Sequence, residues 1–158
     1  MKASSLKELR DELKMHPPEQ LQALCIRLAK FKKENKELLT YLLFEADNEQ
    51  VYIDSVKEEI DEAFDAINRR STYLIKKSLR KILRDTNKYI KYSGLKTTEL
   101  DLLIYFCRKI RTSKIPLSRS VALRNIYVRQ VAKIESVLAK LHEDIQIDYQ
   151  DDIGFLKA

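Results

Sequence analysis

The spacing of the apolar residues is the strongest constraint on this chain, because they recur every three or four positions along most of its length. That spacing places them on one face of an α-helix. Only 2 Gly and 3 Pro interrupt the 158 residues, so we expect long helices with short connections. The sequence therefore predicts an all-α fold: one domain of about seven helices in consecutive antiparallel hairpins, either a helical array of the HEAT type or an irregular bundle.

Capping and breaking residues set the expected helix ends. Ser5 and Glu8 have the spacing of a capping box, and Gly94 is placed to end a helix in the left-handed conformation. Asn35 is expected to mark a break. The helix that follows it is apolar on almost all sides, which predicts burial on several sides. With their caps, the expected helices span residues 5–14, 18–33, 37–45, 48–68, 71–92, 98–112 and 118–142.

The last residues follow a different pattern. Ile145, Ile147 and Tyr149 alternate with polar residues, and this period of two predicts an extended segment. We therefore expect a helical domain over residues 1–142 and an acidic and apolar C-terminal tail over residues 143–158. The tail is either loose or docked in a groove of its own chain or of a neighbour. In the docked alternative, the contact residues are Ile145, Ile147, Tyr149 and Phe155.

The first 45 residues carry a short helix, a proline-led helix and a Leu-rich helix. Their motifs are Leu6-Lys7-Glu8-Leu9, Leu13, Pro18-Glu19-Gln20-Leu21, Leu24, Leu28, Lys36-Glu37-Leu38-Leu39 and Tyr41-Leu42. This order resembles uncharacterised bacterial all-helical domains of unknown function. The resemblance implies a helical fold, and since no activity is established for that group, it implies no particular activity here. The first helix is also similar to the start of a nucleic-acid-binding module of the SAP type, although His16-Pro17-Pro18 stands where those modules have a glycine.

No motif predicts catalysis, a metal or a cofactor. Cys25 and Cys107 lie on apolar stripes, where free cysteines are usually buried in the core. His16 adjoins prolines and His142 stands at an expected helix end, and neither has the spacing of a helical metal site. Two glycines are too few for a phosphate-binding loop. We therefore predict a protein that is not an enzyme.

Charge is unevenly distributed along this chain, which has a net charge of +6. Residues 45–65 hold nine acids and one base, whereas residues 69–92 hold nine bases and one acid. The two segments could neutralise each other across a helix pair. Residues 102–134 hold eight bases and no acid, so nothing nearby in sequence neutralises them.

The bases of residues 69–92 and of residues 102–134 together define a candidate polyanion-binding face, which the helices at 71–92 and 118–142 would share. Interleaved tyrosines (Tyr73, Tyr89, Tyr92, Tyr105 and Tyr127) could stack on nucleic-acid bases there, or could instead belong to the core or its boundary. The candidate binding residues are Lys77, Arg80, Arg84, Lys88, Lys91, Arg119, Arg124 and Arg129.

The sequence leaves two functional hypotheses. The first is a non-enzymatic helical scaffold or protein-interaction module with a protein partner. The alternative is binding of nucleic acid, without sequence specificity, through the basic face. No signal peptide and no membrane-spanning segment is evident, which predicts a cytoplasmic protein with no membrane contact.

Overall fold

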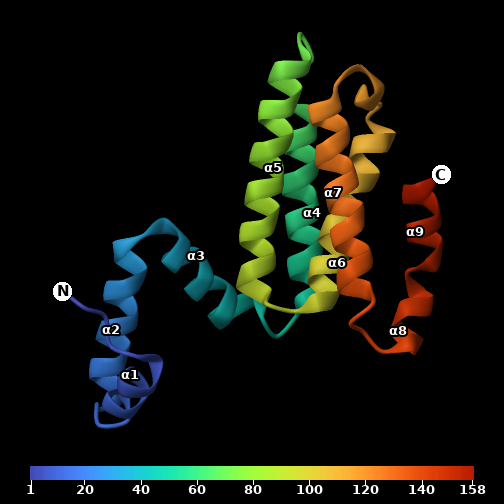
Figure 1. Cartoon of the computed structure of the whole chain (residues 1–158). Helices are drawn as coiled ribbons and strands as arrows, with labels where there is room; N and C mark the ends of the chain where they lie inside the picture. The colour runs from blue at the N-terminus through green and yellow to red at the C-terminus, as the bar shows by residue number, and fades with distance from the viewer. The chain divides into compact units, whose positions relative to one another are not determined.

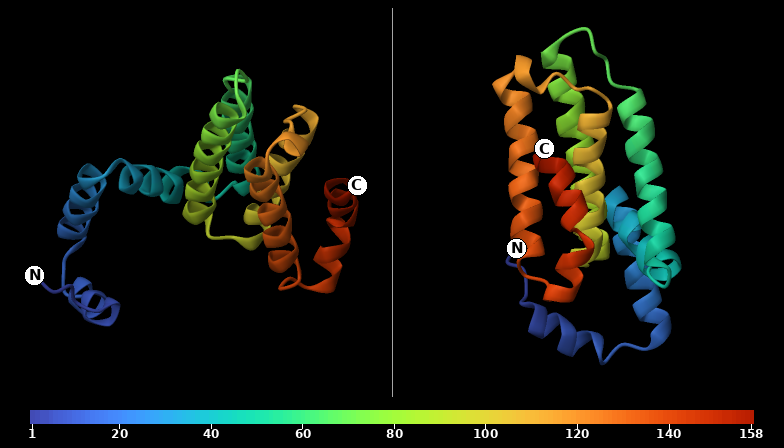
Figure 2. Two further views of the ribbon diagram at one scale, coloured as in Figure 1. Left: turned by 45° about the horizontal axis from the view of Figure 1, so that its top comes forward. Right: turned by 90° about the vertical axis from the view of Figure 1, so that its right-hand side faces the viewer.

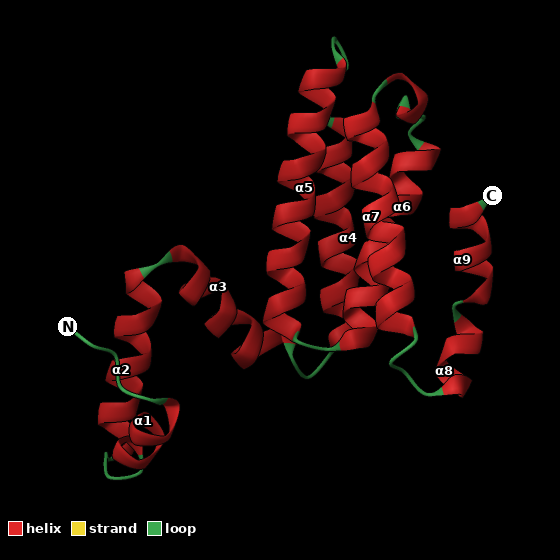
Figure 3. Ribbon diagram, viewed as in Figure 1, coloured by secondary structure: helices red, strands yellow, loops and turns green.

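The computed structural model describes residues 1–158, and every regular element in it is helical (Figure 3). The all-α prediction is therefore confirmed. The helices fall into two compact units, Met1–Phe44 and Glu45–Ala158, which we call unit 1 and unit 2.

Unit 1 contains α1 (Leu6–Leu13), α2 (Pro18–Phe31) and α3 (Lys33–Thr40), and α3 continues into a π-helical turn, η1 (Tyr41–Glu45). Unit 2 contains α4 (Glu49–Asp65), α5 (Thr72–Ser93), α6 (Lys96–Thr112), a 3-10 turn η2 (Leu117–Arg119), α7 (Val121–Leu138), α8 (Glu143–Asp148) and α9 (Gln150–Lys157).

The four long helices of unit 2 run alternately up and down, as the colour sequence from α4 to α7 shows (Figure 1). Helix α6 packs against α4, α5, α7 and α9, and α5 also contacts α7. These contacts between non-consecutive helices create one shared core, as in a bundle, whereas each unit of a repeat array contacts only its neighbours. Fully buried side chains from four helices fill this core: Phe64, Leu79, Leu103, Phe106, Ile110, Leu123 and Ile134.

Several helix ends follow the predicted capping chemistry. The Ser5 hydroxyl accepts from the Glu8 amide while the Glu8 carboxylate accepts from the Ser5 amide, which confirms the capping box. The hydrogen bonds to Ser5 also hold the pKa of Glu8 below its usual value. Ser71 caps α5, and Gly94 ends it with φ of 72°, as predicted.

Two other predicted caps are wrong. Helix α6 begins two residues before Thr98, and Thr98 is buried with its hydroxyl donating to the carboxylate of Glu49. Helix α7 is capped by Ser120 rather than Ser118, because η2 takes up the residues after the proline. In both places several Ser and Thr residues stand close together, and tertiary packing decides which one caps the helix.

The expectation of an extended C-terminal tail is also wrong, because residues 143–157 form α8 and α9. His142, expected to end the preceding helix, instead caps α8 by accepting from the Asp144 amide. Ile145, Tyr149 and Leu156 stand at helical spacing and turn inward, whereas Ile147 is exposed. The segment after residue 142 belongs to unit 2, so the boundary between compact units lies at residues 44 and 45.

Unit 1 differs from unit 2 in having almost no core. Helices α1, α2 and α3 contain no buried residue, and Tyr41 is the only buried residue of the unit. The break between α2 and α3 falls at the extended residue Lys32 rather than at Asn35. The prediction that the helix at 37–45 is buried on several sides is wrong, since Leu43 and Phe44 are 61% and 78% exposed.

We expect Leu79→Ala to lower the free energy of unfolding by about 2–5 kcal/mol, because it leaves a cavity in a closed core. Leu79 is 0% exposed in unit 2, whereas Val121 of the same unit is 67% exposed. Val121→Ala should therefore change stability by no more than ~0.5 kcal/mol. Urea unfolding followed by circular dichroism measures both. Equal losses for the two variants would contradict this placement of the core.

Candidate interaction surfaces

The basic residues of α5 form a stripe on the outer side of that helix. Ile75, Leu79, Ile82, Thr86 and Ile90 face the core, and the bases lie on the opposite side of the helical wheel. From Lys77 to Lys91 the stripe is about 21 Å long, because each residue of an α-helix adds about 1.5 Å. Of the predicted residues, Lys77, Arg80, Arg84 and Lys91 are exposed, and Lys88 is half-buried.

Four exposed bases of this stripe, Lys77, Arg80, Arg84 and Lys91, make no ion pair with the acids of α4. Among these four bases, the one ion pair joins Arg84 to its neighbour Asp85, at 3.7 Å. On α4, the Asp61 carboxylate instead accepts from the hydroxyl of Tyr105 at 2.8 Å and pairs with Lys109 at 3.0 Å, both on α6. Helix α4 therefore directs this carboxylate toward α6.

In the acid-free run at residues 102–134, by contrast, three bases form ion pairs with acids of other helices. Lys109 pairs with Asp61, Lys133 pairs with Glu99 at 2.8 Å, and Arg108 pairs with Asp152 of α9. Three acids distant in sequence thus neutralise bases that have no acid nearby in the chain. In the sequence, residues 102–134 gave the stronger indication of a polyanion partner. In the structure, three bases of this segment are paired with acids.

The predicted bases on and before α7 do not form one face. Arg119, Arg124 and Arg129 are all exposed, but Arg124 is 11 residues from Glu135 and so lies on the same side of the helix. Glu135 pairs with Lys157, so this side of α7 is directed to α9. Arg129 lies instead one turn from Lys133, whose ammonium is 3.4 Å from the Asn87 oxygen of α5.

One of the five interleaved tyrosines is exposed. Tyr73, at the start of α5, is 65% exposed, and the ammonium of Lys76 lies 5.3 Å from its ring centroid. Tyr127 is buried and donates to the carbonyl of Leu156 at 2.7 Å. Tyr105 is partly buried, and burial together with its bond to Asp61 raises its pKa to about 12.

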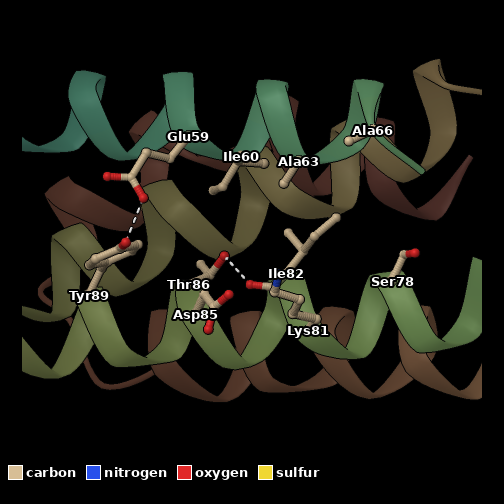
Figure 4. Close-up of a pocket in the computed structure, with 10 residues that line it drawn as sticks. All are labelled: Glu59, Ile60, Ala63, Ala66, Ser78, Lys81, Ile82, Asp85, Thr86 and Tyr89. Carbon is tan, nitrogen blue, oxygen red and sulfur yellow. Dashed lines mark hydrogen bonds between the residues drawn. The ribbon is translucent and has the colours of Figure 1, made fainter. Parts of the chain in front are cut away.

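A groove of about 240 Å³ lies between α4 and α5 (Figure 4). The groove exists because small side chains line it: Ala63 on α4, Ala66 directly after α4, and Ser78 on α5. Three of its polar side chains make hydrogen bonds within the groove: Tyr89 donates to Glu59, and Thr86 donates to the Ile82 carbonyl at 2.9 Å. The groove contains no histidine or cysteine.

The C-terminal helix α9 docks on α6 and α7. Leu156 is buried there, and the Arg111 guanidinium donates to the carbonyls of Phe155 and Leu156 at 2.6 and 3.3 Å. These bonds satisfy carbonyls of the last turn, which have no partner within the helix. The guanidinium groups of Arg108 and Arg111 lie 4.7 and 5.1 Å from the ring centroid of Phe155.

Before α9, one hydrogen bond joins the tail to α6. Tyr149 donates to Asp101 of α6 at 3.0 Å, and burial raises the pKa of both groups. Of the four residues predicted for tail docking, Tyr149 and Phe155 thus make specific contacts with α6. Ile145 is half-buried, and Ile147 is exposed.

Helices α2 and α3 of unit 1 contact each other and meet at a corner (Figures 1 and 2). An apolar groove lies between them, which we call the crook. The crook has a volume of about 260 Å³, and the side-chain amide of Asn35 holds the corner by donating to the Leu28 carbonyl at 2.9 Å. Sequence reasoning assigned these residues to a core, because an apolar stripe does not reveal whether the chain covers it. The lining residues are Cys25, Leu28, Ala29, Asn35, Leu38, Leu39 and Leu42.

The two cysteines have different environments. Cys107 is buried in unit 2, as predicted, and burial raises its pKa to about 12. Cys25 is exposed in the crook, so the prediction that it is buried is wrong. The stripe of α2 is apolar as expected, but within unit 1 no element covers it.

Comparison with known proteins finds no matching family model, no matching curated protein and no matching solved structure. No helix is long and apolar enough to cross a membrane. No group of three or more His, Cys, Asp and Glu side chains is arranged to hold a metal ion.

Leu156→Asp should release α9 from the bundle, because it places a carboxylate in an apolar site that is 2% exposed. We expect amide exchange in α9 to become at least about tenfold faster and the unfolding free energy to fall by about 1–3 kcal/mol. Ile147→Asp, at a position 61% exposed on α8, is the matched control and should leave both unchanged. Unchanged exchange in the Leu156 variant would show that α9 is not held by this contact.

Proposed function

We propose that this protein is a non-enzymatic protein-interaction module and that the apolar crook of unit 1 is its docking surface. The observation that carries this proposal is the lack of a core in unit 1, whose three helices keep apolar stripes in contact with solvent. Exposed apolar surface of this extent is typical of protein-interaction sites.

The distribution of exposed apolar side chains supports this assignment. Unit 2 buries its apolar residues between helices, and those it exposes are scattered over five helices and one connection. Unit 1 has fewer than half as many residues, yet it holds most of the large apolar side chains that are exposed. In unit 1 these are Met1, Leu6, Leu9, Leu13, Met15, Leu24, Ile26, Leu28, Phe31, Leu42, Leu43 and Phe44.

The non-enzymatic part of the proposal rests on the chemistry of the side chains. Cys107 is buried with a raised pKa, which keeps its thiol protonated and unreactive. His16 contacts Gln20 and Glu12, and His142 caps a helix, so both histidines have structural partners. Neither cysteine is hydrogen-bonded to a histidine, the pairing that activates a thiol nucleophile.

We expect Leu28→Asp in a tagged full-length chain to lose protein partners that the wild-type chain captures from an extract of its source cells. A carboxylate in the crook would remain desolvated and unpaired in a complex. Val121→Asp, at an exposed position of α7 in unit 2, is the matched control and should retain them. Quantitative mass spectrometry of the captured proteins, further untagged copies of this chain included, measures the loss. Identical capture by the Leu28 variant and the wild type would refute the crook as the docking surface.

A second candidate function, binding of nucleic acid without sequence specificity, is supported by the basic stripe of α5. Its exposed bases make no ion pair with α4 and lie at a spacing that can follow a phosphate backbone. The exposed ring of Tyr73 at one end of the stripe could stack on a base.

For this candidate, affinity for generic single-stranded DNA or RNA should fall steeply as salt rises from 50 to 200 mM, by roughly 10²-fold or more, because bound counterions are released. The triple reversal Lys77→Glu, Arg84→Glu and Lys91→Glu should abolish binding. The charge-matched control Lys114→Glu, Arg119→Glu and Arg124→Glu changes three exposed bases elsewhere on unit 2 and should weaken binding far less. Fluorescence anisotropy measures all three proteins, and equal effects of the two triple variants would exclude the α5 stripe as the contact.

A further inference from the structure

We propose that the N-terminal half of α5 binds single-stranded nucleic acid, with the ring of Tyr73 stacked on a base and the neighbouring lysines and arginines on phosphates. This inference rests on the second candidate function and deepens it, because it names the form of nucleic acid and the part of the stripe that holds it. The site is a hollow of about 490 Å³ on the surface of α5. Tyr73, Ser78 and the five bases from Lys76 to Arg84 line it, and we call it the basic hollow.

The basic hollow is positively charged along its whole length. No acid lines it, and the first acid of α5 is Asp85, directly after Arg84. Lys77, Arg80, Lys81 and Arg84 are exposed, and the one ion pair among them joins Arg84 to Asp85. Such a row of cations attracts phosphates, and binding gains from the release of counterions. The hollow is about 16 Å long, which at 3.4 Å or more per phosphate accommodates up to about five nucleotides.

The C-terminal half of α5 offers a different surface. There the Lys88 ammonium lies 4.7 and 6.0 Å from the ring centroids of Tyr89 and Tyr92. These two rings meet edge-on with centroids 6.1 Å apart, and the Tyr89 hydroxyl donates to Glu59. Both tyrosines are half-buried. Contacts within the protein thus already engage the aromatic rings of this half, and the exposed ring of α5 lies in the basic hollow.

The ring of Tyr73 decides between polyanions with and without bases. It is 65% exposed, and the Lys76 ammonium, 5.3 Å from its centroid, holds it beside the other cations. An aromatic ring in such a place stacks on a base that is not already stacked within a duplex. Polyphosphate or a surface of anionic lipids would use the lysines and arginines and leave the ring without a partner. The combination therefore favours single-stranded nucleic acid.

The helices beside α5 favour one strand over two. Helix α4 packs against α5, and its Glu59 lines the groove between them, with Glu58 and Glu62 exposed next to it. The second phosphate strand of a duplex laid along α5 would meet these like charges on that side. On the side of α7, Lys133 is already paired with Glu99 at 2.8 Å. A single strand, with one row of phosphates, needs only the cations of α5.

Fluorescence anisotropy of the full chain tests this inference at about 50 mM salt, where electrostatic binding is strong. One probe is a labelled oligothymidylate of about 12 nucleotides, and the other is a blunt duplex of the same length. We expect the single strand to bind at least about fivefold more tightly than the duplex, because only its bases are free to stack. Inorganic polyphosphate is the competitor without bases, and sedimentation with phosphatidylserine vesicles measures binding to a lipid surface.

Tyr73→Ala should weaken binding of the oligothymidylate about fivefold or more, whereas Tyr73→Phe, which keeps the ring, should stay within about twofold of the wild type. The salt dependence of Tyr73→Ala should be unchanged, because no phosphate contact is lost. The inhibition constant of polyphosphate should also be the same for Tyr73→Ala and the wild type. Circular dichroism checks that each variant keeps its helices, as expected for an exposed position.

Lys81→Gln, inside the basic hollow, should reduce the slope of log affinity against log salt by about 0.7, which is the loss of one phosphate contact on a single strand. Lys91→Gln, exposed near the other end of α5, is the charge-matched control and should reduce the slope by less than half as much.

Tighter binding of the single strand, with loss in Tyr73→Ala and retention in Tyr73→Phe, supports the inference. It is overturned, with the second candidate function left in place, by equal affinity for strand and duplex or by an undiminished affinity of Tyr73→Ala. An equal loss in Tyr73→Phe, or equal slopes for the Lys81 and Lys91 variants, overturns it in the same way. A chain that binds neither nucleic acid, whether or not it sediments with the vesicles, would remove the inference and the second candidate function together.

Discussion

The burial of α6 is the constraint on which the rest of unit 2 depends. Its buried residues include Leu102, Leu103, Ile104 and Phe106, which are so close in sequence that they point to different sides of the helix. A helix that is apolar on most of its sides must be covered on most of its sides. Helices α4, α5, α7 and α9 supply that cover, and an edge-on contact of Phe106 with Phe64, with centroids 5.8 Å apart, joins α6 to α4. The docking of α9 contributes to this cover.

The central position of α6 also decides which charges are neutralised. Its bases lie at the boundary between the core and solvent, where acids of the covering helices reach them, as Asp61 reaches Lys109 and Asp152 reaches Arg108. Helix α5 has one face in the core and its exposed bases on the outer side, so no acid of another helix pairs with Lys77, Arg80, Arg84 or Lys91. Neutralisation in this protein therefore follows from the packing of helices and not from the proximity of opposite charges in the sequence.

Unit 1 shows what the same amphipathic pattern produces when no further helix covers it. Leu28 on α2 and Leu38 on α3 stand at core-like positions, yet they line an open crook. The exposed thiol of Cys25 and the buried thiol of Cys107 express the same contrast, because both lie on apolar stripes in the sequence. An apolar stripe becomes part of a core only if enough other helices pack against it. How many do so is decided by the folded chain and not by the stripe itself.

Local information in the sequence determined the helices and many of their ends, since side-chain spacing and capping act within one or two turns. Ser5 and Ser71 cap the beginnings of α1 and α5, and Gly94 caps the end of α5, as their chemistry predicts. The period-two pattern around Ile147, by contrast, predicted an extended segment where α8 and α9 form. The tertiary structure alone decided that four bases of the α5 stripe are exposed and make no ion pair with α4, that Asp61, Glu99 and Asp152 pair with three bases of the acid-free run, and that the crook of unit 1 is exposed. Each of these three outcomes depends on contacts between residues far apart in the chain. Neither the periodicity nor the composition of the sequence indicates which helix faces pack together.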